Sequence, residues 1–143
     1  MINLSGNSIS TVWRENGFVY KRQMKFLCEN EFWCLNRLIN SGYTPQAWRI
    51  DDETIQMEDL GESQKVTDMS CLTNHLKPIL DALSLASIRH GDLTEKNIIV
   101  KENKPYIIDF SESRLWDDPR PDKRPEGDAF WLRKTISELC AKM

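Results

Sequence analysis

Two carboxylates and one amide are spaced along the second half of the chain in a way that could serve metal-dependent chemistry on a hydroxyl group. Asp92 and Asn97 lie five residues apart in the stretch HGDLTEKNII, and Asp109 follows twelve residues later, before Phe110. Amide and carboxylate oxygens are the ligands that Mg²⁺ uses when it is bound against phosphates, and a further carboxylate can orient an acceptor hydroxyl. An Asp or an Asn alone is more often a turn residue, but the joint spacing of these residues favours a catalytic, metal-binding site.

This segment resembles the catalytic loop H-R-D-L-x-x-x-N and the metal-binding motif D-F-G of the protein-kinase-like superfamily. Gly91 stands in place of the arginine, and Ser111 stands in place of the last glycine. The resemblance implies that Asp92 accepts or orients the proton of the acceptor hydroxyl. It also implies that Asn97 and Asp109 bind Mg²⁺.

Residues upstream match the other polar positions of that superfamily. Lys21 ends the run FVYK, which resembles the V-A-I-K strand, and Glu31 lies in the helical segment that follows. Glu29 is an alternative partner for Lys21, but Glu31 is preferred because a small and a long apolar residue follow it at plus three and plus four. Lys96 could reach the transferring γ-phosphoryl group, and an ordinary surface lysine is the equally open alternative.

The resemblance also places an adenine site around the stretch MEDLG. Met57 would be the gatekeeper residue of a hinge between two lobes. The backbone carbonyl of Glu58 and the N–H of Leu60 would meet the adenine edge. Ordinary core packing is an equally compatible reading of the apolar residues that would enclose the base, which are Val12, Val19 and Ile99.

The loop that would cover the phosphates is the weakest match. It is the stretch LSGNSIS, in which Gly6 and Ser8 leave room for backbone N–H groups to approach phosphate. One glycine stands here where protein kinases usually have three. A lone glycine before a strand is more often a turn, so this assignment rests on position alone.

The elements that must position these residues begin with a β-hairpin. Asn16-Gly17 is a strong two-residue turn signal between two strand-like runs. Pairing outward from this turn sets Val12 opposite Lys21, and Val19 then points to the same face.

The rest of the chain alternates helical and strand-like patterns. His75 is expected to be an exposed helix residue, whereas His90 is expected to orient the loop before Asp92. Asp128 either caps the last helix or anchors the backbone of that loop. The remaining predicted elements are a helix over 24–40 with an apolar stripe of Phe26, Trp33, Leu35, Leu38 and Ile39, strands at 47–50 and 54–57, a polar linker at 62–68, a helix over 72–88 with Pro78 in its first turn, a hairpin of 98–100 with 106–108, a loop at 116–127 and a helix over 129–140.

Composition narrows the class of protein. The 143 residues suffice for one domain, and 19 basic against 22 acidic residues give a net charge of −3, which argues against direct nucleic-acid binding. The sequence contains no long apolar run and no signal-peptide pattern, so we predict a cytoplasmic protein without membrane contact. The four cysteines form no CxxC pair and are expected to be reduced packing residues; they are Cys28, Cys34, Cys71 and Cys140.

Together these observations predict an α+β, protein-kinase-like fold of two lobes in a single domain over 1–143. Residues 1–61 would form an antiparallel five-stranded N-lobe with one helix and the hinge, and residues 62–143 a truncated, mainly helical C-lobe. The H-G-D variant is similar to RIO-type kinases, to the kinase of the tRNA threonylcarbamoyladenosine-modification complex, to lipopolysaccharide-core sugar kinases and to aminoglycoside phosphotransferases.

This resemblance implies an ATP- and Mg²⁺-dependent phosphotransferase, with a serine/threonine protein kinase that can phosphorylate itself as the preferred reading. A small-molecule kinase for sugars or aminoglycosides, or a nucleotide-binding pseudokinase, is the alternative. No A-P-E motif or long activation segment follows Asp109, which predicts dependence on a protein substrate or an activating protein partner.

Overall fold

The computed structural model describes residues 2–3 and 10–143. Its elements, in chain order, are β1 (Ile2–Asn3), β2 (Ser10–Glu15), β3 (Phe18–Gln23), α1 (Lys25–Arg37), β4 (Ala47–Arg49), β5 (Thr54–Glu58), α2 (Met69–Thr73), α3 (Leu76–Leu85), β6 (Ile88–Arg89), the 3₁₀ turn η1 (Glu95–Asn97), β7 (Ile98–Lys101), β8 (Lys104–Ile107), β9 (Arg114–Leu115) and α4 (Asp128–Ala141).

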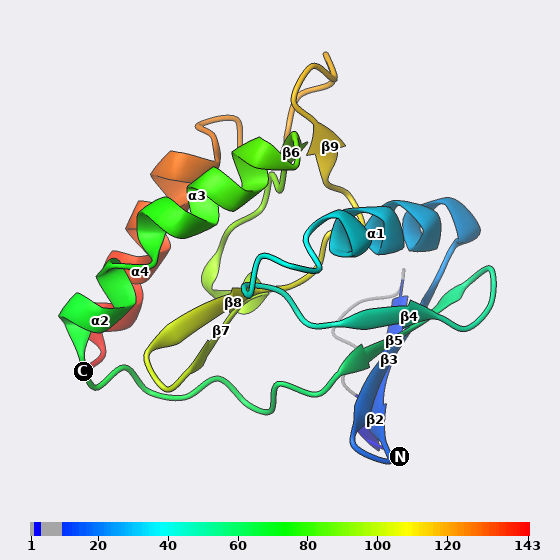
Figure 1. The fold of residues 1–143 in the computed structure, drawn as a ribbon, viewed down its shortest axis with the longest axis horizontal. Coiled ribbons are helices and arrows are strands. Elements are labelled where there is room, and N and C mark those ends of the chain that lie inside the picture. Colours follow the sequence, from blue (N-terminus) through cyan, green and yellow to red (C-terminus); the bar gives the residue numbers. More distant parts are fainter. Residues whose placement is uncertain (1, 4–9) are drawn as a thin grey trace.

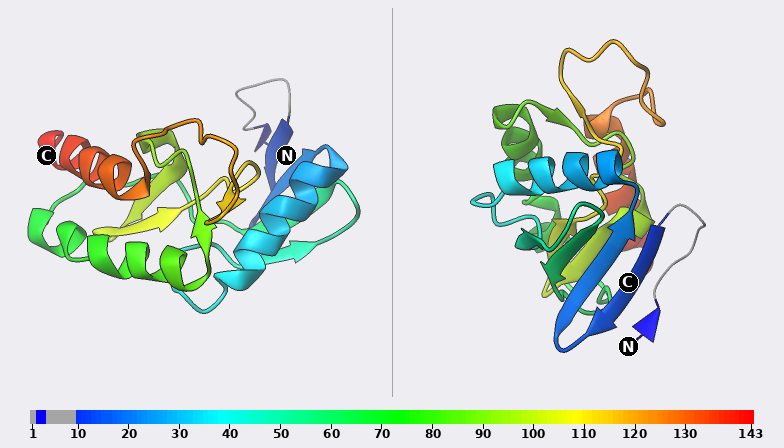
Figure 2. Two further views of the ribbon diagram at one scale, coloured as in Figure 1. Left: turned by 90° about the horizontal axis from the view of Figure 1, so that it is seen from above. Right: turned by 90° about the vertical axis from the view of Figure 1, so that its right-hand side faces the viewer.

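The N-lobe is an antiparallel five-stranded sheet in the order β1-β2-β3-β5-β4, with α1 packed against it (Figure 1). Figure 2 shows the sheet and the helices α3 and α4 at opposite ends of the molecule. The predicted hairpin register is confirmed, because Val12 is paired with Lys21 and Arg14 with Val19. Alternation along the two strands therefore brings Val12, Val19 and Lys21 to one face.

The buried face of α1 differs from the predicted apolar stripe, and the helix is shorter at both ends than 24–40. Phe26, Trp33 and Ile39 are exposed, whereas Leu35 and Leu38 are buried as predicted. The sequence pattern misleads here because a charged residue lies at the centre of the buried face. That face consists of Leu27, Cys28, Glu31, Cys34, Leu35 and Leu38.

The predicted linker between the lobes contains no helix or strand and runs along the β7–β8 hairpin. The Gln64 N–H donates to the carbonyl of Val100 at 2.7 Å, and the Val100 N–H donates to Ser63 Oγ at 2.9 Å. Val66 is buried. The linker is thus fastened to the C-lobe from Ser63 onward.

The predicted helix over 72–88 is wrong as one element, because it divides into α2 and α3, and Ile88 belongs to β6. Pro78 has no N–H to donate to the preceding turn, so a helix that contains it has to begin just before it. α3 accordingly begins at Leu76. Ser87, with φ +58°, then reverses the chain into β6.

The helices α2 and α3 pack with α4, and the buried apolar residues of both lobes form one continuous core. Cys28, Cys34 and Cys140 are buried free thiols, as expected for packing residues. Within the described part of the chain, no helix combines the length and the apolar content that crossing a membrane requires.

Side chains at the end of α1 and in the loop after it tie the two lobes together. The Arg37 guanidinium donates to the carbonyl of Ala86 at 3.0 and 2.8 Å, and the Ile107 N–H donates to the carbonyl of Tyr43 at 2.7 Å. The Tyr43 hydroxyl lies 2.7 Å from His75 Nδ1. His75 is therefore half-buried in a contact between the lobes. The prediction that it is an exposed helix residue is wrong.

This contact predicts a pH-dependent contribution to stability. Burial lowers the pKa of His75, and the nearby charge of Lys104 lowers it further. The unfolded chain therefore binds a proton at His75 more readily than the folded chain does. The contribution of His75 to folding stability is complete above its ordinary pKa of about 6.5, and it is lost as the pH falls through the lower pKa of the folded state. We expect the difference in unfolding free energy between wild type and His75→Gln to shrink between about pH 7.5 and about pH 5 in urea titrations. A difference that stays constant over this range would contradict the prediction.

Candidate active site

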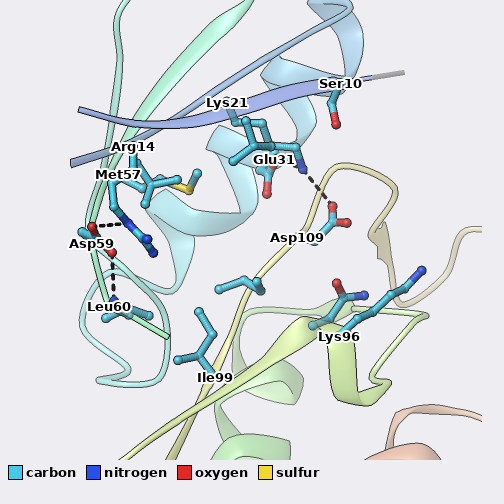
Figure 3. A pocket seen from close by; sticks show the side chains of 15 residues that line it. Ser10, Arg14, Lys21, Glu31, Met57, Asp59, Leu60, Lys96, Ile99 and Asp109 are labelled. Atoms are coloured by element: carbon cyan, nitrogen blue, oxygen red, sulfur yellow. Dashed lines mark hydrogen bonds and ion pairs between the residues drawn. The ribbon is translucent and has the colours of Figure 1, made fainter. Parts of the chain in front are cut away.

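A cavity of about 380 Å³ lies between the sheet and the loops of the C-lobe. Figure 3 shows the apolar side chains of Met57, Leu60 and Ile99 at one end, beside the ion pair of Arg14 and Asp59, and Lys21, Asp109 and Lys96 at the other. An apolar end and a polar, charged end suit a ligand with a flat base and phosphates. The residues that line the cavity are Ser10, Val12, Arg14, Val19, Lys21, Glu31, Met57, Asp59, Leu60, Gly61, Lys96, Asn97, Ile99, Ile108 and Asp109.

Most of the predicted site residues are brought together here. Glu58 lies outside the cavity lining; its side chain is exposed and accepts a hydrogen bond from the Gln46 N–H. Asp92 also lies outside the lining, beside Asn97. Gly6 and Ser8 lie outside the described residues.

Lys21 joins the two lobes at the polar end of the cavity. Its Nζ lies 2.9 Å from Glu31 Oε1 and 3.0 Å from Asp109 Oδ1. Burial by itself lowers the pKa of Lys21, but attraction to Glu31 and Asp109 outweighs it, and the net shift of the pKa is upward. Lys21 is therefore a fixed positive charge in the cavity.

Glu31 is fully buried and connects several groups at once. Besides Lys21, Oε1 accepts from Gln23 Nε2 at 2.8 Å, and Oε2 accepts from the Phe110 N–H at 3.0 Å. Glu29, by contrast, is exposed and lies 3.6 Å from Arg49. The geometry thus selects Glu31, not Glu29, as the partner of Lys21.

Asp109 adopts a left-handed backbone conformation, with φ +62°. Its Oδ1 accepts from Lys21 Nζ and also from Ser111 Oγ at 2.8 Å. Burial raises the pKa of Asp109, but the charge of Lys21 and these hydrogen bonds outweigh it and lower the pKa overall. The serine that replaces the expected glycine therefore helps to hold the carboxylate in place.

Asn97 and Asp109 each have one side-chain oxygen left for a metal ion. Asn97 Nδ2 donates to the carbonyl of Asp92 at 2.8 Å and to Asp92 Oδ2 at 3.2 Å, so the amide oxygen is not used in these bonds. Among the described residues, no group of three or more His, Cys, Asp and Glu side chains could hold a metal ion. An amide and a carboxylate fit Mg²⁺ that is bound largely through phosphates and water.

The loop before Asp92 is held from two directions. Asp128 accepts from the N–H groups of His90 and Gly91 at 2.8 and 2.9 Å, and the structure shows no side-chain cap on α4. Of the two roles considered for Asp128, the structure thus selects the anchor. His90 contacts the carbonyl of Ile108 through Nε2 at 2.9 Å and accepts from the Asp92 N–H through Nδ1, which orients the loop as predicted.

Two contacts at the site were not predicted from the sequence. Arg14 Nε lies 2.6 Å from Asp59 Oδ2, at the same end of the cavity as Met57 and Leu60 (Figure 3), and connects β2 to the hinge. Asn30 Nδ2 donates to the carbonyls of Ser111 and Ser113 at 3.0 and 2.8 Å, with the carbonyl of Phe110 at 3.3 Å. Asn30 therefore fixes α1 to the segment that follows Asp109.

Replacing Asn30 should weaken this connection between the lobes. In Asn30→Ala, buried carbonyls lose their donor, and we expect a loss of about 1–3 kcal/mol in unfolding free energy. Asn36→Ala is a matched control, because it makes the same change at an exposed position of the same helix. Urea denaturation of both variants measures the difference, and equal stabilities would contradict the role of Asn30.

A five-stranded sheet with one helix, joined by a linker to a small helical lobe, is the architecture of the protein-kinase-like superfamily, and this chain is an atypical member of it. The family model for the RIO domain matches residues 12–128, and the chain belongs to that family. A comparison with curated proteins gave no match.

Among solved structures, the chain resembles the Rio2 kinase of Chaetomium thermophilum, which was determined as an ADP/Mg²⁺-phosphoaspartate complex. The two chains are 16% identical, and the TM-score is 0.66. The match covers 99% of this chain and 52% of the Rio2 chain. This chain thus spans about half the length of the structure that it resembles.

Proposed function

We propose that the chain is an ATP- and Mg²⁺-dependent phosphotransferase of the atypical kinase type, with a serine or threonine hydroxyl of a protein as its acceptor. The observation that carries this proposal is the position of Lys21 Nζ between Glu31 and Asp109 in a cavity with one apolar end. A fixed cation at the polar end would bind the α- and β-phosphates. The ADP and Mg²⁺ in the Rio2 kinase structure support this choice of ligands.

The apolar end of the cavity would take the adenine. Val12 and Val19 would cover one side of the base and Ile99 the other, with Met57 behind it. The backbone groups of Glu58 and Leu60 would meet the adenine edge. Gly6 and Ser8 would supply backbone N–H groups to the phosphates, and this part of the proposal rests on the sequence.

Asn97 and Asp109 would hold Mg²⁺, which supplies positive charge against the phosphates of the nucleotide. Asp92 would accept the proton of the acceptor hydroxyl while the hydroxyl oxygen forms a bond to the γ-phosphorus. The bond from that phosphorus to the β–γ bridging oxygen breaks, and ADP leaves. Lys96, whose Nζ lies 3.8 Å from Asp92 Oδ2, would contact the transferring group.

We propose a cytoplasmic location, no direct contact with nucleic acid or membrane, and a protein substrate or an activating protein partner. The net charge of −3 supports the absence of direct contact with nucleic acid or an anionic membrane. A small-molecule kinase acting on a sugar or an aminoglycoside would share the nucleotide site, and so would a pseudokinase. The small-molecule kinase differs from the proposal in what receives the phosphoryl group, whereas a pseudokinase would transfer none.

Incubation with γ-labelled ATP tests the proposal. We expect label to be transferred to the protein itself, to added protein or to water in the presence of Mg²⁺, and not in the presence of EDTA. Label that appears only on small hydroxyl compounds would replace the protein-kinase assignment with the small-molecule one. Nucleotide binding without any label transfer would identify a pseudokinase and refute the enzymatic proposal.

A further inference from the structure

Three cationic side chains converge on the carboxylate of Asp92. Arg124 Nε donates to Asp92 Oδ1 at 3.1 Å, and the Nζ atoms of Lys123 and Lys96 lie 3.7 and 3.8 Å from Oδ2. Lys96 belongs to the same loop, whereas Lys123 and Arg124 come from the segment between β9 and α4. A segment distant in the sequence thus brings two further positive charges to the proposed acceptor position.

Arg124 is held in place by more than its ion pair. Its backbone N–H donates to the carbonyl of Gly91 at 3.2 Å, and its guanidinium lies 4.8 Å from the ring centre of Trp131. About a third of its side chain is exposed. A guanidinium held in this way loses little conformational freedom when an anion binds to it.

The acidic side chains near these cations are engaged by other groups. Asp122 pairs with Arg89 and Arg114, and Asp128 accepts from backbone N–H groups. Glu95 pairs with Lys142, and Glu126 accepts from Trp131 Nε1. Among the described residues, Asp92 is thus the carboxylate that is in ion-pair contact with Lys96, Lys123 and Arg124.

The nucleotide site does not account for Lys123 and Arg124. Lys96 lines the nucleotide cavity and serves the γ-phosphate in the proposed function. Neither Lys123 nor Arg124 lines that cavity, and more than half of the Lys123 side chain is exposed. These two cations face an open surface next to Asp92, which suits an extended peptide better than an enclosed small molecule.

On the basis of the proposed function, we infer that the acceptor is a serine or threonine within an acidic protein segment, recognised by Lys123 and Arg124. A carboxylate next to the acceptor residue gives Arg124 a new partner. Arg124 then releases Asp92 Oδ1, which is the atom that an acceptor hydroxyl needs. A basic segment would be repelled by the same two cations.

Three serine peptides that differ only in their flanking residues test the inference, with glutamate, alanine or lysine on both sides of the serine. At saturating ATP and Mg²⁺, wild type should phosphorylate the glutamate peptide with the highest kcat/KM. Lys123→Ala and Arg124→Ala should each lower the ratio of kcat/KM for the glutamate peptide to kcat/KM for the alanine peptide by about fivefold. Arg124→Gln, which keeps most of the side chain, provides a second variant at this position.

Lys134→Ala is the matched control, because Lys134 also lies over the Trp131 ring, at 4.6 Å, without an ion pair to Asp92. It should behave as wild type with all three peptides. Equal use of the three peptides by wild type, or an acidic preference that survives in the Lys123→Ala/Arg124→Ala double variant, would overturn the inference. Mg²⁺-dependent transfer of label to the chain itself or to added protein, without phosphorylation of any peptide, would overturn it and leave the proposed function standing. Failure to turn over ATP under any condition would refute the proposed function itself.

Discussion

Asp92→Asn is expected to lower the rate of phosphoryl transfer by about 10²–10⁴-fold, the range in which a general base contributes to catalysis. Asparagine has nearly the same shape, but it cannot take the proton of the acceptor hydroxyl. Asp92 lies outside the lining of the nucleotide cavity, so the affinity for ATP and Mg²⁺ should change little. Steady-state transfer of label from γ-labelled ATP and calorimetric titration with the nucleotide measure the two effects separately.

Asp81→Asn serves as the control for this variant. Asp81 is an exposed residue of α3 whose contact is an ion pair with Lys77 one turn earlier, so the same chemical change there should leave the transfer rate unaltered. If Asp92→Asn retained a transfer rate within tenfold of wild type, the assignment of Asp92 as the base would be wrong. If it lost nucleotide binding as well, Asp92 would act through the structure of the loop.

Glu31→Ala should lower the free energy of unfolding by about 3 kcal/mol or more, because it removes one partner of a buried ion pair and the acceptor of two further buried donors. Lys21 would keep Asp109, but Gln23 Nε2 and the Phe110 N–H would lose their acceptors. In a domain of this size the loss corresponds to a decrease in Tm of about 10 °C. Thermal denaturation and urea titration would measure it.

The same helix offers a matched control in Glu29→Ala. Glu29 is exposed, and its contact with Arg49 is long at 3.6 Å, so the change in unfolding free energy should stay within about 0.5 kcal/mol. Where Glu31→Ala does not fold, Glu31→Gln keeps the shape and allows the measurement. Equal stabilities of the Glu31 and Glu29 variants would show that the buried network contributes nothing.

The parts of the site that follow from local rules could be predicted from the sequence. The Asn16-Gly17 turn fixes the register of the hairpin, and strand alternation then sets Lys21 on the face of Val12 and Val19. Helical spacing from Glu31 to the apolar residues that follow it distinguishes Glu31 from Glu29. These inferences need only the geometry of single elements and their immediate neighbours.

Other features depend on contacts that local patterns do not contain. Phe26 and Trp33 of α1 face outward, and the polar side chain of Glu31 occupies the centre of the buried face, which apolar periodicity cannot anticipate. The role of Asn30 becomes visible only through the backbone carbonyls that accept from it. Every residue has a carbonyl, so the sequence carries no signal for this contact. Lys123 and Arg124 lie in a loop without periodicity, and only the folded chain shows that they reach Asp92.

The attachments between the lobes restrict how they can move. The linker is fastened to the β7–β8 hairpin from Ser63 onward, and the end of α1 with its following loop is fastened through Arg37 and Tyr43. A third set of contacts joins Lys21, Glu31 and Asn30 to residues 109–113. An opening motion of the lobes would therefore have to break at least one of these three attachments.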